Sequence, residues 1–286
     1  MASAIQIVEC PRDAMQGWPT IISSADKKAY ISKLLQCGFH TLDCLSFVSP
    51  KAVPQMADSH VVAAAIASVD AATQKLAIVL NERGATEACQ YDHVDVLGYP
   101  FSISPTFQSK NGNSTIDESI QRLQHIVNIA QEHNKDVVVY ISMAFGNPYG
   151  DEYDKDMVGD FISRIAALGV NTFSLADTVG VAQPADVYDL CNVLIPVLQT
   201  LSFGVHLHST PALAEKKIEA AWRAGCKRFD VAVGGYGGCP MAGNELVGNI
   251  NTAQLIAFCN KEGIPHGVDM HSLHEAQSIA GKIFTN

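Results

Sequence analysis

The sequence predicts an α/β fold, a (β/α)8 or TIM barrel with an extra C-terminal helix, on three observations. Eight β-type runs alternate with helical patterns, four helix–glycine–strand junctions recur, and the length of 286 residues is near the ~250 typical of one such barrel. Strict alternation implies parallel strands with right-handed crossovers. Eight units favour a closed barrel, and an open doubly wound sheet is the alternative. We expect residues 1–286 to form one domain.

Hydrophobic patterning assigns the individual elements in chain order. The strands are expected near residues 5–10, 39–47, 75–81, 94–99, 136–143, 172–177, 202–208 and 226–233. The helices are expected near residues 24–37, 58–68, 84–90, 115–133, 155–168, 184–199, 213–224 and 252–262, with the extra helix near 272–284. The clearest helix has Thr115 and Glu118 at capping-box spacing before an apolar face.

The repeated junction is an amphipathic helix that ends at a glycine and passes directly into a β-type run. Its glycines are Gly38, Gly169, Gly225 and Gly263. Glycine adopts the left-handed conformation that ends a helix and reverses the chain, so each of these positions is expected to be a left-handed cap. The absence of a G-x-G-x-x-G motif after the first strand argues against a dinucleotide-binding fold.

The composition disfavours several classes of function. Hydrophobic residues make up 48% of the chain and the formal net charge is −10, with 19 Lys and Arg against 29 Asp and Glu. This balance disfavours a nucleic-acid partner, and no apolar run approaches the ~20 residues of a membrane span. The eight cysteines have no paired spacing and are expected to be reduced thiols. Reduced thiols indicate a cytoplasmic location, and because the first β-type run begins almost at the start, we expect no targeting peptide.

Polar residues gather where the expected strands end, which is where a barrel carries its catalytic groups. His206 and His208 lie two apart on one strand, so both side chains point to the same face and suit a single metal ion. Two hydrogen-bonded core histidines would have the same spacing. The position at a strand end, with Asp13 available from the first strand, favours the metal site. Mixed nitrogen and oxygen donors suit Mg²⁺ or Mn²⁺, and the lack of a cysteine cluster argues against structural zinc.

Other residues at this rim are candidates for charge stabilisation and orientation. The guanidinium of Arg12 could hold a developing oxyanion or a substrate carboxylate, or form a plain salt bridge. Asp43 and Asp177 could orient ligands and water, or cap the helices that follow them. Residues 234–238 contain four glycines, which predicts a mobile lid over 234–249 that would bring Cys239 to the rim.

Four blocks resemble the 3-hydroxy-3-methylglutaryl-CoA lyase family of metal-dependent barrel lyases. They are VECPRDAMQ at 8–16, SFVSPKAVPQM at 46–56, GVHLHST at 204–210 and GGYGGCPMAGNELVGN at 234–249. The chain departs from the family pattern where Ala14 and Met15 replace Gly-Leu, where Asp43 replaces Glu, and where Ser209 replaces Asp. These departures leave the family's metal ligands in place and leave the acyl group of the substrate open.

The resemblance implies a role for each matching residue. It implies the metal ligands Asp13, His206, His208 and Asn249, the catalytic residues Arg12, Cys239, His206, Asp43 and Asp177, and the substrate-binding residues Ser174, Ser46 and Gln16. The reaction implied is cleavage of 3-hydroxy-3-methylglutaryl-CoA to acetoacetate and acetyl-CoA with Mg²⁺ or Mn²⁺, as in leucine degradation and ketone-body formation. The expected partners are a small-molecule acyl-CoA substrate and a second copy of the chain in a homodimer, with no nucleic acid and no membrane.

Two other functions agree with the same residues. A related aldolase or lyase of the superfamily would act on another 3-hydroxyacyl-CoA or on a 2-oxo acid, and Asp43 and Ser209 leave room for it. A metal-binding barrel without turnover would serve as a sensor or scaffold. Release of acetyl-CoA from a panel of substrates distinguishes the three.

Overall fold

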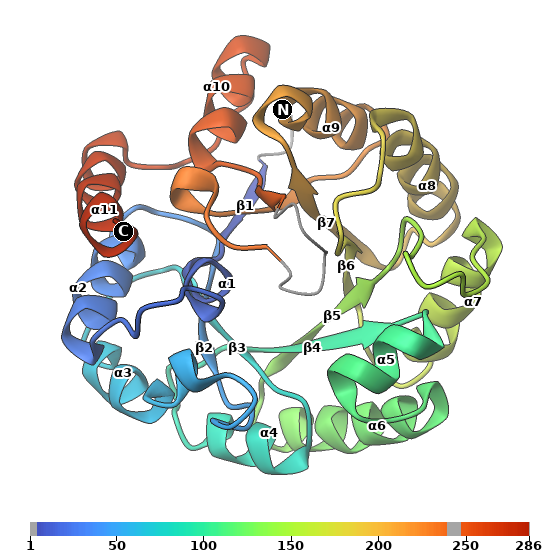
Figure 1. Cartoon of the computed structure of the whole chain (residues 1–286), viewed down its shortest axis with the longest axis horizontal. Helices are drawn as coiled ribbons and strands as arrows, with labels where there is room; N and C mark the ends of the chain where they lie inside the picture. The colour runs from blue at the N-terminus through green and yellow to red at the C-terminus, as the bar shows by residue number, and fades with distance from the viewer. Residues whose placement is uncertain (1–4, 239–246, 286) are drawn as a thin grey trace.

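A closed barrel of eight parallel strands forms the centre of the structure, a computed structural model that describes residues 5–238 and 247–285 (Figure 1). Each strand pairs with its neighbour in sequence, and the pairing of β1 with β8 closes the barrel. The strands are β1 (Gln6–Glu9), β2 (Thr41–Ser46), β3 (Gln74–Ile78), β4 (Val96–Ser102), β5 (Asp136–Ser142), β6 (Thr172–Asp177), β7 (Ser202–Ser209) and β8 (Arg228–Val231). The predicted barrel is confirmed, and the open sheet is excluded.

Helices surround the barrel between successive strands (Figure 1). They are α2 (Ser24–Leu35), α3 (Ser59–Ile66), α4 (Glu82–Cys89), α6 (Ile116–Glu132), α7 (Lys155–Ala166), α8 (Pro184–Val197), α9 (Pro211–Arg223) and α10 (Thr252–Glu262). The predicted extra helix is α11 (Met270–Ile283), which packs beside α2. Among the described residues no helix has the length and apolar character needed to cross a bilayer.

The predicted caps form as expected. Gly38, Gly169, Gly225 and Gly263 all have positive φ, between 65° and 100°. At the start of α6, Thr115 Oγ1 accepts a hydrogen bond from the Glu118 backbone N–H at 3.2 Å, and Glu118 Oε2 accepts one from the Thr115 N–H at 2.8 Å. These local signals set where each helix begins and ends, and so where each strand enters the barrel.

Short elements that the sequence patterns did not predict lie in the loops. They are α1 (Pro11–Gln16), the 3-10 helix η1 (Pro54–Met56), α5 (Pro105–Gly112), the 3-10 helix η2 (Val233–Gly235) and β9 (Gly248–Asn249). Helix α1 has a proline at its first position, where the missing N–H costs no hydrogen bond. At six residues it is too short to produce a helical periodicity. It nevertheless shapes the site, because three of the predicted residues, Arg12, Asp13 and Gln16, lie on it.

The lid predicted over 234–249 is described only at its ends. At one end η2 follows β8. At the other, β9 pairs antiparallel with β7, with Asn249 opposite His208. Cys239 lies outside the described residues.

Candidate active site at the carboxyl ends of the strands

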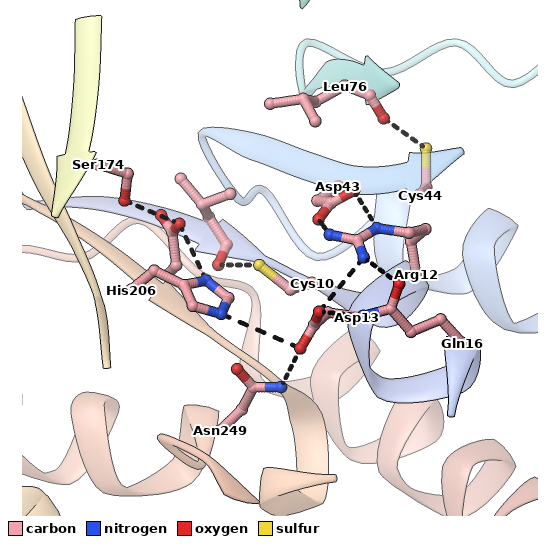
Figure 2. A network of polar contacts seen from close by, with 12 residues as sticks. Cys10, Arg12, Asp13, Gln16, Asp43, Cys44, Leu76, Ser174, His206 and Asn249 are labelled. Carbon is pink, nitrogen blue, oxygen red and sulfur yellow. Dashed lines mark hydrogen bonds and ion pairs between the residues drawn. The ribbon is translucent and has the colours of Figure 1, made fainter. Parts of the chain in front are cut away.

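The predicted metal ligands come together from three separate elements, and Figure 2 shows three of the four, Asp13, His206 and Asn249. Asp13 lies on α1, directly after β1, and His206 and His208 lie on β7 with both side chains turned to the mouth of the barrel. One donor atom from each of these three residues falls within 4.8 Å of the others. The antiparallel pairing of β9 with β7 brings Asn249 to the same point, where its Nδ2 lies 2.7 Å from Asp13 Oδ2. The four residues are buried.

The hydrogen bonds behind the two imidazoles decide which ring nitrogen faces the cluster. His208 Nδ1 lies 3.1 Å and 3.0 Å from the backbone oxygens of Asp177 and Thr178. Because carbonyl oxygens only accept, Nδ1 carries the proton and Nε2 carries the lone pair. That Nε2 is buried and has no hydrogen-bond partner among the described residues. His206 Nδ1 likewise lies 3.3 Å from Oδ2 of Asp230, and its Nε2 lies 4.0 Å from Asp13 Oδ2.

These features fit a bound cation. An unpartnered imidazole nitrogen in a buried site is costly unless a proton donor or a metal satisfies it. Burial, followed by the neighbouring His206, lowers the pKa of His208, so its imidazole is neutral as a metal ligand requires. Burial alone would raise the pKa of Asp13, but Arg12 and the two histidines outweigh it and lower that pKa to about 2. The donor set of one carboxylate and two imidazoles suits a divalent cation. Asn249 contacts Asp13 through its Nδ2, a hydrogen-bond donor, so its role as a ligand stays a prediction.

Arg12 lies beside this cluster and makes four hydrogen bonds (Figure 2). Its Nε and one terminal nitrogen donate to the two carboxylate oxygens of Asp43 at 3.1 Å and 2.5 Å. The other terminal nitrogen donates to Asp13 Oδ1 at 3.2 Å and to Gln16 Oε1 at 2.8 Å. Gln16 also donates to Asp13 Oδ1 at 2.8 Å. Asp43 therefore orients Arg12 by a two-pronged ion pair. Although aspartate is one methylene shorter than the glutamate of the family pattern, its carboxylate still reaches the guanidinium.

A cavity of about 360 Å³ opens beside the cluster. Its polar lining includes Arg12, Asp13, Gln16, Ser46, His206 and His208. Its apolar lining includes Val48, Val53, Ile78, Leu80, Pro100 and Phe107. The cavity thus combines a charged end, where a carboxylate or hydroxyl could bind, with an apolar wall.

Four of the predicted site residues that the structure describes do not line this cavity: Asp43, which contacts Arg12, Asn249, which contacts Asp13, and Asp177 and Ser174. The carboxylate of Asp177 accepts hydrogen bonds from Lys217 Nζ at 2.8 Å and from the Val181 N–H at 2.9 Å, while its backbone oxygen orients His208. Ser174 Oγ donates to Asp230 Oδ2 at 3.1 Å. Asp177 thus helps to orient His208, whereas Ser174 contacts Asp230 and neither histidine. The catalytic role of Asp177 and the substrate-binding role of Ser174 stay predictions.

The sequence patterns missed residues that support the site. Asp230 on β8 contacts His206, Ser174 and, through Oδ1, Arg228 at 3.0 Å. The signal was present, because Arg228 and Asp230 alternate on a strand and therefore point together into the barrel. Lys217, which is 1% exposed, also donates to the His208 carbonyl at 2.7 Å. Lys217 was missed because a lysine in a helical pattern is usually exposed, and nothing in the sequence around it on α9 indicates burial.

Comparison with known proteins identifies the family of this chain. The HMGL-like family model matches residues 4–279. The chain is 32% identical to rat 3-hydroxy-3-methylglutaryl-CoA lyase, cytoplasmic, over 95% of the chain and 79% of that protein, and 33% identical to the mitochondrial hydroxymethylglutaryl-CoA lyase of Macaca fascicularis, over 95% and 83%. An HMG-CoA lyase of Acinetobacter baumannii, solved with coenzyme A and 3-methylmalate, superposes with a TM-score of 0.90 at 28% identity, covering 99% of this chain and 93% of that one. The chain therefore belongs to the HMGL-like family and is a carbon–carbon lyase.

Proposed function

We propose that this protein is a divalent-metal-dependent lyase that cleaves 3-hydroxy-3-methylglutaryl-CoA to acetoacetate and acetyl-CoA. The observation that carries the proposal is the cluster of Asp13, His206 and His208 donor atoms within 4.8 Å of one another, at the charged end of a cavity that also contains Arg12. The relatives described above bear the name of this activity.

The cation would be held by Asp13, His206, His208 and Asn249, and we propose Mg²⁺ or Mn²⁺ because the donors are mainly oxygen and imidazole nitrogen. Such a cation lowers the pKa of a bound hydroxyl group and neutralises an adjacent carboxylate. Asp230 and the backbone oxygens of Asp177 and Thr178 hold the imidazole Nδ1–H groups. They thereby keep both Nε2 lone pairs directed at one point.

In the proposed reaction, the tertiary hydroxyl of the substrate gives its proton to a base near the cation, and the bond between C2 and C3 breaks. The hydroxyl carbon becomes the ketone of acetoacetate, and the electron pair leaves as the enolate of acetyl-CoA, which then takes up a proton. A guanidinium has five N–H groups, and the described residues accept hydrogen bonds from four of those of Arg12. The remaining N–H and the positive charge suit stabilisation of the developing oxyanion. Ser46 and Gln16 line the same cavity and are proposed to contact substrate.

The remaining parts of the proposal rest on the sequence. Residues 1–286 would form one domain with a lid at 234–249, from which Cys239 would protonate the acetyl-CoA carbanion. A cytoplasmic location is supported by the seven described cysteines, which are all free and buried, and by the rat relative, although the macaque relative is mitochondrial. A homodimer completes the proposal.

The test is release of acetyl-CoA by the purified protein from a panel of 3-hydroxyacyl-CoA and 2-oxo acid substrates, before and after treatment with EDTA. We expect 3-hydroxy-3-methylglutaryl-CoA to be cleaved fastest, EDTA to abolish the activity, and Mg²⁺ or Mn²⁺ to restore it. Faster cleavage of another substrate would replace the acyl group proposed here. Activity that survives EDTA would overturn the metal dependence, and no turnover with any substrate would favour a binding protein.

A further inference from the structure

Glu9 is a fully buried acid that the proposed reaction does not use. It ends β1, where it lies on the same face of the strand as Ile7, outside the barrel. Its Oε1 accepts a hydrogen bond from the Val233 N–H at 2.7 Å, and its Oε2 accepts one from Thr252 Oγ1 at 2.6 Å. No Lys or Arg among the described residues forms an ion pair with it. Burying a carboxyl group without a cation costs free energy. The two residues that Glu9 contacts, Val233 and Thr252, indicate its role.

The two partners of Glu9 lie at opposite ends of the segment that carries Asn249. Val233 begins η2 directly after β8, and Thr252 begins α10, three residues after Asn249. The same ends are joined by two backbone hydrogen bonds, from the Ala232 N–H to the Ile250 oxygen at 3.0 Å and from the Thr252 N–H to the Ala232 oxygen at 3.2 Å. One carboxyl group therefore links both ends of the segment to the strand that leads into Arg12 and Asp13.

The described stretch that follows Val233 is rich in glycine. Gly234, Gly235, Gly237 and Gly238 all have φ between 70° and 131°, a backbone region that glycine enters and leaves at low cost. Asn249 is held by a hydrogen bond from its Nδ2 to the Tyr236 oxygen at 2.9 Å and by its pairing with β7. Because Tyr236 belongs to the glycine-rich stretch, the place of the Asn249 amide depends on how firmly the two ends are fixed.

We propose that Glu9 is a positioning residue that holds both ends of the segment 233–252 against β1 and thereby places Asn249 beside Asp13. This inference rests on the proposed function, in which Asn249 is a ligand. A carboxyl group suits the task in either protonation state. When ionised it accepts from both partners, and when protonated it accepts from the Val233 N–H and donates to Thr252 Oγ1, since a hydroxyl group can do either.

Two substitutions of Glu9 should differ in the hydrogen bonds that they keep. Glu9→Gln keeps both contacts, because the amide oxygen accepts from Val233 and the amide nitrogen donates to Thr252. Glu9→Met has similar volume and keeps neither. Tyr99→Phe is a matched control, because it removes a buried hydrogen bond to Ser119, on α6, far along the chain from the segment.

The experiment measures the affinity of each folded variant for Mn²⁺ by the electron paramagnetic resonance of the free ion, and then kcat and KM at saturating Mn²⁺. We expect Glu9→Met to bind Mn²⁺ about tenfold or more weakly, as for other residues that orient a ligand, with KM for the acyl-CoA little changed. Glu9→Gln and Tyr99→Phe should bind Mn²⁺ as the unaltered protein does. If Glu9→Met does not fold, Thr252→Val, which removes one contact, takes its place, with Thr252→Ser as its conservative partner.

Two results overturn the inference. One is an unchanged Mn²⁺ affinity in Glu9→Met, or in Thr252→Val if that variant takes its place. The other is a Glu9→Gln variant as weak as Glu9→Met, which would mean that charge and not hydrogen bonding matters. The proposed function fails separately: if the unaltered protein binds no Mn²⁺, or if Asn249→Ala binds it normally, the ligand assignment is wrong whatever Glu9 does.

Discussion

His206 Nδ1 lies 3.3 Å from Oδ2 of Asp230, and the other ring nitrogen, Nε2, lies 4.0 Å from Oδ2 of Asp13. The other oxygen of Asp230 accepts from Arg228, so both carboxylate oxygens face donors. Asparagine at this position has one acceptor oxygen and must turn its NH₂ group toward one of these donors. We predict that Asp230→Asn weakens Mn²⁺ binding by about 10–100-fold, measured by titration of the free ion. Ser174→Ala, which removes one contact to Asp230 and keeps His206, should retain the affinity, and equal affinities in the two variants would contradict the prediction.

Arg12→Lys should impair turnover far more than metal binding. Lysine keeps the charge and cannot form the two-pronged contact with Asp43 or the contacts to Asp13 and Gln16 together. We expect kcat to fall about a hundredfold to a thousandfold, as when a donor to an oxyanion is removed, while Mn²⁺ affinity stays within the same order of magnitude. Steady-state kinetics at saturating Mn²⁺ measure the effect. A normal kcat in the Arg12→Lys variant would remove Arg12 from the reacting atoms.

Cys239→Ser should lower kcat strongly with Mn²⁺ affinity unchanged, because serine is a far weaker acid. The other seven cysteines are buried, and burial raises the pKa of several of them, with that of Cys37 and Cys226 at about 12. Alkylation should therefore fall first on Cys239 and be slowed by substrate. Peptide mapping after brief iodoacetamide treatment identifies the site. Labelling mainly at another cysteine, such as Cys89, would argue against an accessible catalytic thiol.

Lys217→Met should destabilise the fold markedly. The side chains of Lys217 and Asp177 are both almost fully buried, with Nζ and Oδ2 2.8 Å apart, and removing the cation leaves a buried carboxylate without its partner. The expected loss in the free energy of unfolding is about 3 kcal/mol or more. Lys261→Met is the matched control, because it breaks an exposed pair with Glu215, and exposed ion pairs contribute little to stability. Urea denaturation measures the free energy of unfolding of both variants. Losses of equal size would show that the buried pair stabilises the fold no more than the exposed pair does.

The stability conferred by Glu9 should depend on pH. Burial raises the pKa of Glu9 from 4.5 to about 8, against the hydrogen bonds from Thr252 and Val233, which lower it. Between these values the unfolded chain is ionised at this residue and the folded protein is protonated, so folding takes up a proton and stability falls as pH rises. Glu9→Gln does not titrate. The urea midpoints of both proteins are measured at about pH 5.5 and about pH 8.5, which bracket the shift. The midpoint of the unaltered protein should fall more at the higher pH than that of Glu9→Gln. If the two midpoints differ by the same amount at both pH values, the pKa of Glu9 is not raised.

The residues at the strand ends show which parts of the site sequence patterns can predict. His206 and His208 were found because a spacing of two places side chains on one face of any strand, whatever surrounds it. Asp13 was found because it follows a strand. Asp177 ends a strand as well, yet its carboxylate turns to Lys217, which lies forty positions later on α9. Nothing local distinguishes these two aspartates, since the difference lies in which distant side chain each one meets.

The sequence by itself determined the eightfold alternation of strands and helices, the glycine caps that end the helices, and the identity of the residues at the rim. These follow from backbone preferences and from periodicity, which act within a few residues. The tertiary structure alone decided that Asp230 and the Asp177 and Thr178 carbonyls hold the histidines, that Asp43 holds Arg12, and that Glu9 joins Val233 to Thr252. The first two pairings depend on the register between consecutive strands, β6 with β7, β7 with β8 and β1 with β2. The Glu9 contacts depend on barrel closure as well, because only closure brings β1 beside β8.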